Sequence, residues 1–297
     1  MQMVSRREAL LALAAAAGKP AAGAPAGPVI ETHVHLFDPE RVPYAPNAPY
    51  KPAAYRLEDH VKMAAAAGLA HSIIVHPEPY QDDHRYLEYC LGHEPRPGYF
   101  KGTCLFDPFR EDTPKRLRAL VERWPGRIVA MRIHEMSMTP EEGGPIRNRD
   151  MRDPRMQACW RAMASLRLAV QMHFIPAQAP HIHTLAERFP ETLVILDHMG
   201  RPGQGTPEEY AEVLKLAKLP RVVLKYSNWA GYNGDLGELT RRIYDAFGPD
   251  RMLWGMLGTT EAEYRKQAAR FEELLQFAPE TDRAKIRGGN AQKLFFA

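Results

Sequence analysis

The stretch PVIETHVH (residues 28–35) holds the first clue to the fold, because it is a short apolar run that ends in two histidines. Seven further runs of this kind follow along the chain, all rich in Val, Ile, Leu or aromatic residues and poor in charge. Parallel strands that are buried on both faces have this composition. The eight predicted strands are residues 28–35, 71–76, 98–106, 127–134, 168–174, 192–198, 222–226 and 252–254.

Segments with helical spacing separate these runs. Two of them open with Thr-Pro pairs, Thr113-Pro114 and Thr206-Pro207, which are typical of an N-cap followed by proline in the first helical turn. The predicted helices are residues 57–67, 83–91, 113–123, 154–165, 179–188, 206–216, 236–247 and 261–275.

Eight strand–helix units over about 270 residues match the size and rhythm of a (β/α)8 TIM barrel. A doubly wound sheet is the competing α/β architecture, but no Gly-rich phosphate turn follows the first strand. The sequence therefore predicts a single TIM-barrel domain over residues 28–297. The Pro- and Tyr-rich segment 38–55 is too long for an ordinary strand–helix connection and is a candidate lid or substrate loop.

The N-terminal 26 residues form a predicted export signal. An arginine pair at Arg6-Arg7 precedes a short Ala/Leu run that reaches Ala17, and residues 24–26 read APA. The S-R-R-x-x-L arrangement of residues 5–10 resembles a twin-arginine signal, which implies a periplasmic protein that is exported after folding. The alternative is an amphipathic helix at a cytoplasmic N-terminus. No other stretch is long and apolar enough to span a membrane.

Charge and cysteine content exclude several classes of function. The 39 basic and 36 acidic residues leave a net charge of only +3, and they form no block of like charge. This balance gives no case for binding nucleic acid or a membrane surface after the signal is removed. Three cysteines without C-x-x-C spacing do not suggest a disulfide framework. The expected partner is a small molecule, and a homo-oligomer is left open.

Four histidines stand at the ends of three predicted strands. His33 and His35 are two residues apart, so on a strand they point to the same face. His173 closes the fifth run and His198 closes the sixth. Imidazoles that meet over one barrel mouth suit zinc and similar metals. The alternative is that each is a separate, hydrogen-bonded core histidine. For any single residue this is the better interpretation, but for the four residues together a shared site is the better one.

Several motifs resemble those of the amidohydrolase superfamily, in particular its branch of sugar lactonases and 2-pyrone-4,6-dicarboxylate lactonases. The resemblance covers nearly the whole chain after the signal. The motifs are ETHVHLFDP (residues 31–39), with Glu31 in place of the usual aspartate, VHPEPYQDDH (75–84), LDHMGRP (196–202) and LKYS (224–227). Asn290 resembles part of a C-terminal cap of structural character.

The resemblance implies a site for one divalent metal ion, with zinc as the first choice, on His33, His35 and His173. His198 would orient the water or the substrate carbonyl. Such an ion lowers the pKa of its bound water and polarises the carbonyl. The predicted substrate-binding residues, for an anionic or polyhydroxylated substrate, are Arg132, Tyr80, His84 and Lys225. For Arg132, a structural ion pair inside the barrel is an equal alternative to binding a carboxylate.

One departure from the family pattern concerns the base. The strand-eight motif of the family places an aspartate where this chain has Leu257, and leucine can neither bind metal nor accept a proton. We take His198 as the first candidate for the base, because imidazole titrates near neutral pH, and Glu135 as the second. The prediction is an exported hydrolase that opens a lactone or similar cyclic ester. The alternatives are a barrel that binds its ligand without turnover and a decarboxylase or hydratase on the same scaffold.

Overall fold

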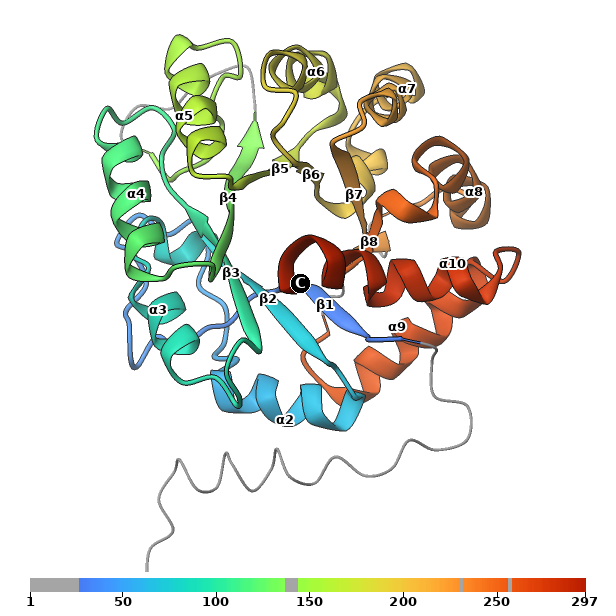
Figure 1. Cartoon of the computed structure of the whole chain (residues 1–297), viewed down its shortest axis with the longest axis horizontal. Helices are drawn as coiled ribbons and strands as arrows, with labels where there is room; N and C mark the ends of the chain where they lie inside the picture. Colours follow the sequence, from blue (N-terminus) through green and yellow to red (C-terminus); the bar gives the residue numbers. More distant parts are fainter. Residues whose placement is uncertain (1–26, 137–143, 230–231, 256–257) are drawn as a thin grey trace, which may run out of the picture.

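Eight parallel strands pair in sequence order from β1 to β8 in a computed structural model that describes residues 27–136, 144–229, 232–255 and 258–297 (Figure 1). A hydrogen bond from the Thr32 hydroxyl to the Trp254 carbonyl, 2.7 Å long, joins β1 to β8 where the barrel closes. The predicted TIM barrel is confirmed. The strands are β1 (Ile30–Val34), β2 (His71–Val75), β3 (Phe100–Leu105), β4 (Ile128–Met136), β5 (Ala169–Phe174), β6 (Val194–Leu196), β7 (Val222–Tyr226) and β8 (Met252–Trp254).

Helices cover the outside of the barrel, as Figure 1 shows. The predicted helices are all present, with ends that shift by at most two residues, and a short helix near the C-terminus was not predicted. The helices are α2 (Leu57–Ala67), α3 (Arg85–Gly92), α4 (Thr113–Arg123), α5 (Pro154–Ser165), α6 (Ala179–Arg188), α7 (Pro207–Lys215), α8 (Leu236–Phe247), α9 (Glu261–Leu274) and α10 (Glu280–Ala284).

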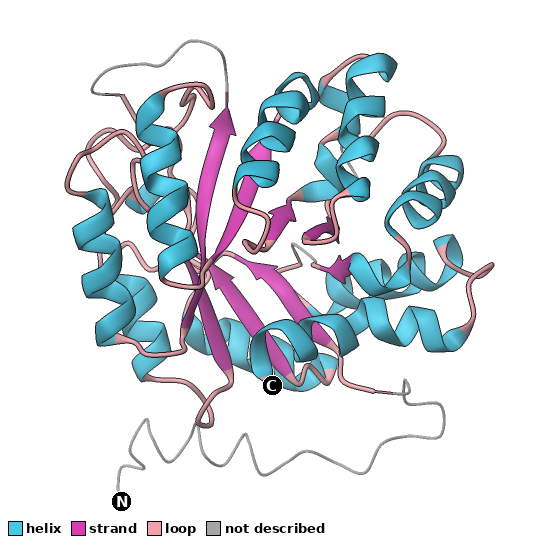
Figure 2. Cartoon of the chain, turned by 45° about the horizontal axis from the view of Figure 1, so that its top comes forward, coloured by secondary structure: helices cyan, strands magenta, loops and turns pink. Residues whose placement is uncertain are grey.

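The strand ends differ from prediction by at most two residues, and the differences at the carboxyl ends concern the candidate site. β1 ends at Val34 and β6 at Leu196, so His35 and His198 lie just beyond their strands. β4 runs on to Met136, past the predicted end at residue 134. All of these ends meet at one opening of the barrel, which we call the mouth, where sites lie in TIM-barrel enzymes. Figure 2 shows the strand arrowheads pointing to this side and the C-terminus at the other.

An apolar floor closes the barrel at the amino ends of its strands. Small and branched residues from seven strands pack there against two residues near the C-terminus. These are Phe295 of the C-terminal turn η9 (Gln292–Phe296) and Ala291, which precedes that turn. The strand residues are Ile30, Ile73, Ala130, Ala169, Ile195, Val223 and Leu253. The side-chain amide of Asn290 donates hydrogen bonds to the carbonyls of Pro249 and Met252, so its predicted structural role as a cap is confirmed.

The segment predicted as a lid or substrate loop is anchored at both ends. Phe37 and Tyr55 exchange two backbone hydrogen bonds of 2.8 and 2.9 Å, which form an antiparallel bridge at the base of the segment. The backbone N–H of Asp38 also donates to the hydroxyl of Tyr80, at 2.7 Å. These contacts fix where the segment starts and returns beside the mouth.

None of the described helices is long and apolar enough to cross a membrane.

Two buried histidines that are not among the four predicted site histidines make stability depend on pH. Burial lowers the pKa of His60 to about 3 and that of His76 to about 4, whereas each is near 6.5 in an unfolded chain. Below pH 6.5 the unfolded chain therefore binds protons that the folded chain does not, and the free energy of unfolding falls as pH falls. Between pH 7.5 and 5.5 we expect the two residues to lower it together by about 3 kcal/mol.

Urea unfolding at the two pH values measures this loss. The variant His60→Gln keeps a hydrogen-bonding side chain beside Tyr55 and Ser72, which contact both ring nitrogens of His60. This variant should lose about 1.4 kcal/mol less than the parent over the same range. Equal or greater stability of the parent at pH 5.5 would contradict the prediction.

Candidate active site

Five imidazole rings form a continuous row across the mouth, which we call the histidine row. Its neighbouring ring centroids are 4.9 Å apart for His35 and His33, 4.5 Å for His33 and His198, 5.3 Å for His198 and His173, and 4.4 Å for His173 and His134. The four histidines singled out in the sequence thus meet at one opening, although 165 residues separate the first from the last.

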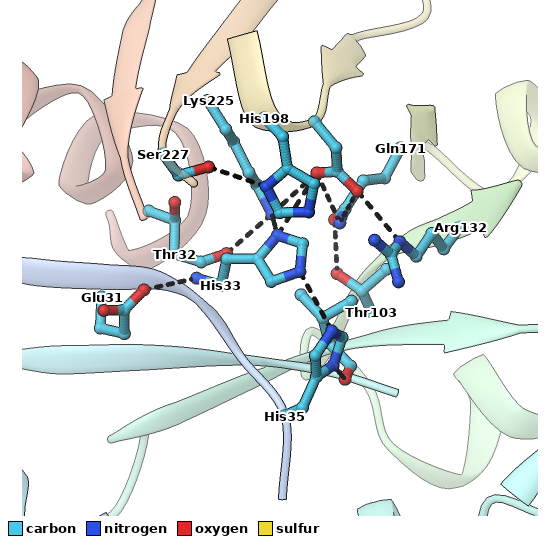
Figure 3. Close-up of polar contacts among 12 residues, drawn as sticks. Glu31, Thr32, His33, His35, Thr103, Arg132, Gln171, His198, Lys225 and Ser227 are labelled. Atoms are coloured by element: carbon cyan, nitrogen blue, oxygen red, sulfur yellow. Dashed lines mark hydrogen bonds and ion pairs between the residues drawn. The ribbon is translucent and has the colours of Figure 1, made fainter. Parts of the chain in front are cut away.

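His33 and His35 present the same ring atom to each other. Their Nε2 atoms are 3.3 Å apart (Figure 3). Nδ1 of His35 lies 2.7 Å from the carbonyl of Val75, and because a carbonyl only accepts, this nitrogen carries the proton. Nε2 of neutral His35 is therefore an unprotonated lone pair that faces His33. A proton or a metal ion between the two rings is needed to satisfy both nitrogens.

The spacing of the pair fits zinc. Two nitrogens bound to one zinc ion at about 2.0–2.1 Å in tetrahedral geometry lie roughly 3.3–3.4 Å apart. Burial lowers the pKa of His35 to about 3 and holds that of His33 well below its usual value. Both rings are therefore neutral at pH 7, which is the form that binds metals. His173 also lies in the row, and its buried Nδ1 has no hydrogen-bond partner among the described residues.

A buried carboxylate lies directly below the row. Asp197 is fully buried and accepts hydrogen bonds from Nε of Arg132 at 3.0 Å and from the amide of Gln171 at 3.0 and 3.1 Å. Nδ1 of His33 lies 3.4 Å and Nζ of Lys225 3.7 Å from the same carboxylate. Burial alone would raise the pKa of Asp197, but the neighbouring His33, Arg132 and Lys225 lower it well below its usual value.

Asp197 acts as the partner of a histidine more readily than as a metal ligand. His33, Asp197 and His198 do offer ligand atoms within 4.8 Å of one another, which makes them an alternative metal group. However, both Asp197 oxygens already accept hydrogen bonds from Gln171, and one of them also from Arg132. A carboxylate behind a metal-binding imidazole orients the ring and increases its basicity. We therefore pair Asp197 with His33, and an ion held by His33 would lie on its Nε2 side.

An unusual backbone turn positions His198. His198, Met199, Gly200 and Arg201 all have positive φ angles, of 52°, 58°, 70° and 56°. Left-handed conformation is costly for residues with a side chain and occurs at sites where surrounding contacts hold it. Here the Tyr210 hydroxyl donates to the Met199 carbonyl at 2.8 Å, and Ser227 contacts Nδ1 of His198 at 3.0 Å. The turn leaves Nε2 of His198 as the ring atom available for a water or a substrate.

We expect Gly200→Ala to destabilise the protein by about 2–4 kcal/mol. A Cβ at this position would collide with the side chain of Val213, and φ is +70°. Overpacking costs about 1–3 kcal/mol, and left-handed strain costs about 1–2 kcal/mol. Urea unfolding measures the loss, with Gly237→Ala as the control, because Gly237 lies in α8 without a positive φ or a severe contact. Equal stability of the two variants would contradict the account of the turn.

The predicted substrate-binding residues already have partners within the protein. Arg132 is only 3% exposed and its Nε is bound to Asp197, which favours the alternative of a structural ion pair. Nζ of Lys225 donates to the carbonyl of Thr32 at 2.7 Å. Tyr80 anchors Asp38, as described above. Nε2 of His84 accepts from the backbone of Leu105 at 3.1 Å, and its ring packs on those of His76 and Phe106.

Burial changes the chemistry expected of His198. It lowers the pKa of this residue to about 3, so the ring is a weaker base than an imidazole in water. His198 was the first candidate for the base because a free imidazole titrates near neutral pH. Burial removes that reason, and the role of His198 as the base stays a prediction. The side chain of Glu135, the second candidate base, lies outside the described part of the structure. So does Leu257.

His134 and Gln171 belong to the site but were not selected from the sequence. In the β4–β5 register Arg132 pairs with Gln171, and His134 pairs with His173. The two pairs are successive inward layers of the barrel, with side chains that point to the same face. The signal was the alternation R-x-H in β4 beside Q-x-H in β5, which repeats the two-residue spacing of His33 and His35.

Comparison with known proteins agrees with this arrangement. The amidohydrolase family profile matches residues 30–297. The chain belongs to the amidohydrolase family. Two curated relatives of this amidohydrolase are named as lactone hydrolases. A 4-sulfomuconolactone hydrolase of Hydrogenophaga intermedia is 26% identical in an alignment of 284 positions that covers 89% of this chain and 88% of the relative. An L-fucono-1,5-lactonase of Burkholderia ambifaria is 24% identical in an alignment of 251 positions that covers 79% of this chain and 82% of the relative.

A solved structure gives the same fold and contains a metal. This is an amidohydrolase of Burkholderia multivorans with bound zinc, which superposes on our amidohydrolase with a TM-score of 0.70 at 19% identity. The match covers 91% of this chain and 99% of the other. The relatives agree with the lactonase-like branch that the motifs predicted.

Proposed function

We propose that this amidohydrolase is an exported lactonase that binds one zinc ion at His33 and His35 and opens a small cyclic ester with water. The observation that carries the proposal is the 3.3 Å approach of the two Nε2 atoms at the mouth of the barrel. The names of the two curated relatives support the lactone as substrate class. Export rests on the twin-arginine-like segment alone, which lies outside the described residues.

The residues of the histidine row have different proposed roles. His33 and His35 hold the ion, with His173 as the predicted third ligand, and Asp197 orients His33 from behind. When bound, zinc supplies an acidified water and polarises the ester carbonyl. His198, fixed by Ser227, orients the water or the carbonyl through Nε2. With Leu257 in place of the family's aspartate, His198 is also our first candidate to accept the proton from water.

The substrate class is a small lactone, anionic or polyhydroxylated. Arg132 and Lys225 are held by Asp197 and Thr32, but their positive charges remain below the mouth. Burial lowers the pKa of Lys225 to about 8, so it is still mostly protonated at pH 7. Because ionised Asp197 lies between them, Arg132, Lys225 and Asp197 together leave one net positive charge below the row, which favours an anionic substrate and the negative charge that develops on the carbonyl oxygen.

Metal analysis combined with a lactone panel tests the proposal. We expect about one zinc per chain, activity on at least one sugar or muconate-type lactone, loss of activity with a chelator and recovery with zinc. A protein that binds zinc and lactones but hydrolyses none of them would be the non-catalytic alternative. Leu257→Asp sharpens the distinction, because activity that appears only in this variant would show that the parent is not a hydrolase of this type.

A further inference from the structure

A cavity lies at the opposite end of the barrel from the mouth. Its volume is about 890 Å³, within the range of small-molecule sites. It lies between the C-terminal turn η9 and the segments that lead into β4, β5, β6 and β7. In Figure 1 the C-terminal turn lies across this end of the barrel, and in Figure 2 it lies at the strand ends away from the arrowheads. The proposed chemistry does not use this cavity.

The wall of this cavity combines an apolar part with a cationic one. The apolar part includes Leu193, Leu294 and Phe295. Arg167, Arg221 and Lys293 supply three positive charges, and Glu191 supplies one negative charge. None of the three cations forms an ion pair with any residue in the described ranges. Most arginines elsewhere on the protein do have a carboxylate partner, for example Arg152 with Asp150.

A buried hydroxyl in the same wall has no partner. Thr192 is 5% exposed and lines the cavity, and its Oγ1 makes no hydrogen bond within the described part of the structure. A buried hydroxyl without a partner costs free energy, and such groups are rare in folded proteins. A ligand oxygen in the cavity would satisfy it. An oxygen atom of an anionic ligand could therefore interact with the three cations and with this hydroxyl.

We propose that this cavity is a binding site for a small amphipathic carboxylate, an aliphatic or aromatic acid with an apolar body. The net charge of +2 on the wall selects an anion, and the planar guanidinium groups of Arg167 and Arg221 match the two oxygens of a carboxylate. The apolar body packs on Leu193, Leu294 and Phe295. Because η9 forms one wall, the bound acid ties the C-terminal turn to the strands and stabilises the folded state.

Calorimetric titration with 4-phenylbutyrate tests this site, with its neutral amide, 4-phenylbutanamide, as the matched ligand. We expect the acid to bind more tightly than the amide, and its affinity to fall as salt is added. The double variant Arg221→Glu, Lys293→Glu changes two exposed side chains, so the fold is retained. It should weaken binding of the acid about tenfold, which corresponds to about 1.4 kcal/mol.

The control is Lys62→Glu, a charge reversal in a different cavity. That cavity has a volume of about 580 Å³ and lies between α2 and the start of α9. Lys62→Glu should bind 4-phenylbutyrate as the parent does. No binding at millimolar acid, equal binding of acid and amide, or unchanged binding by the double variant would each overturn the proposal. So would a loss of binding in Lys62→Glu. None of these results depends on whether the protein hydrolyses lactones.

Discussion

His35→Ala is expected to remove both the proposed zinc binding and the proposed lactonase activity while leaving the protein folded. The ring is partly exposed, and its hydrogen bond outside the row, among the described residues, is to the Val75 carbonyl. Its loss therefore costs little stability. It removes one of the two Nε2 atoms that face each other across 3.3 Å, however, and we expect a fall in activity of at least about 10³-fold.

Metal content after dialysis, activity and thermal unfolding of the variant are compared with those of His183→Ala. His183 lies on α6, is 34% exposed and pairs with Glu187, so its removal deletes an imidazole that is not part of the histidine row. This control should keep zinc and activity. Full zinc content in His35→Ala would contradict the assignment of the ion to this pair.

Asp197→Ala is expected to destabilise the protein by about 3–5 kcal/mol, because it leaves buried charges without their partner. Arg132 and Lys225 are 3% and 1% exposed, and both face this carboxylate. The loss is a large fraction of the 5–15 kcal/mol that typically separates folded from unfolded protein. Zinc affinity should fall as well, by about 10–100-fold, because Asp197 supports His33.

Urea unfolding and zinc titration measure the two effects. Asp112→Ala is the matched control, since Asp112 and its partner Arg110 are 46% and 54% exposed and such a pair is worth about 0–1 kcal/mol. Asp197→Asn separates the effect of the lost charge from that of the lost side-chain volume. The amide has nearly the same volume as the carboxylate, but it carries no negative charge to compensate Arg132 and Lys225. A stability of Asp197→Ala within error of Asp112→Ala would refute the role of Asp197.

Strand periodicity explains why the barrel and four histidines could be predicted. A buried parallel strand is a short apolar run, and the end of each run predicts the mouth of the barrel. His33, His173 and His198 stand at such ends, so their meeting followed from the fold. The two-residue spacing of His33 and His35 predicted a shared direction, which their Nε2 atoms confirm.

The partners of charged side chains could not be predicted in the same way. Arg132 at a strand end can point to a substrate or to a buried carboxylate, and only the β4–β6 neighbourhood places it on Asp197. The sequence likewise does not reveal the hydrogen-bond partner of the Tyr80 hydroxyl, which here accepts from the backbone N–H of Asp38. His134 was missed although it closes the fourth predicted strand, as His173 closes the fifth, and the β4–β5 register pairs the two residues.

Diffraction data collected at the zinc absorption edge from crystals of the zinc-loaded protein test the central claim most directly. We expect one anomalous peak at the mouth, about 2.0–2.1 Å from Nε2 of both His33 and His35. A peak bonded instead to the carboxylate of Asp197 would contradict our assignment, and the absence of any peak beside the two rings would remove the basis for a metal-dependent lactonase.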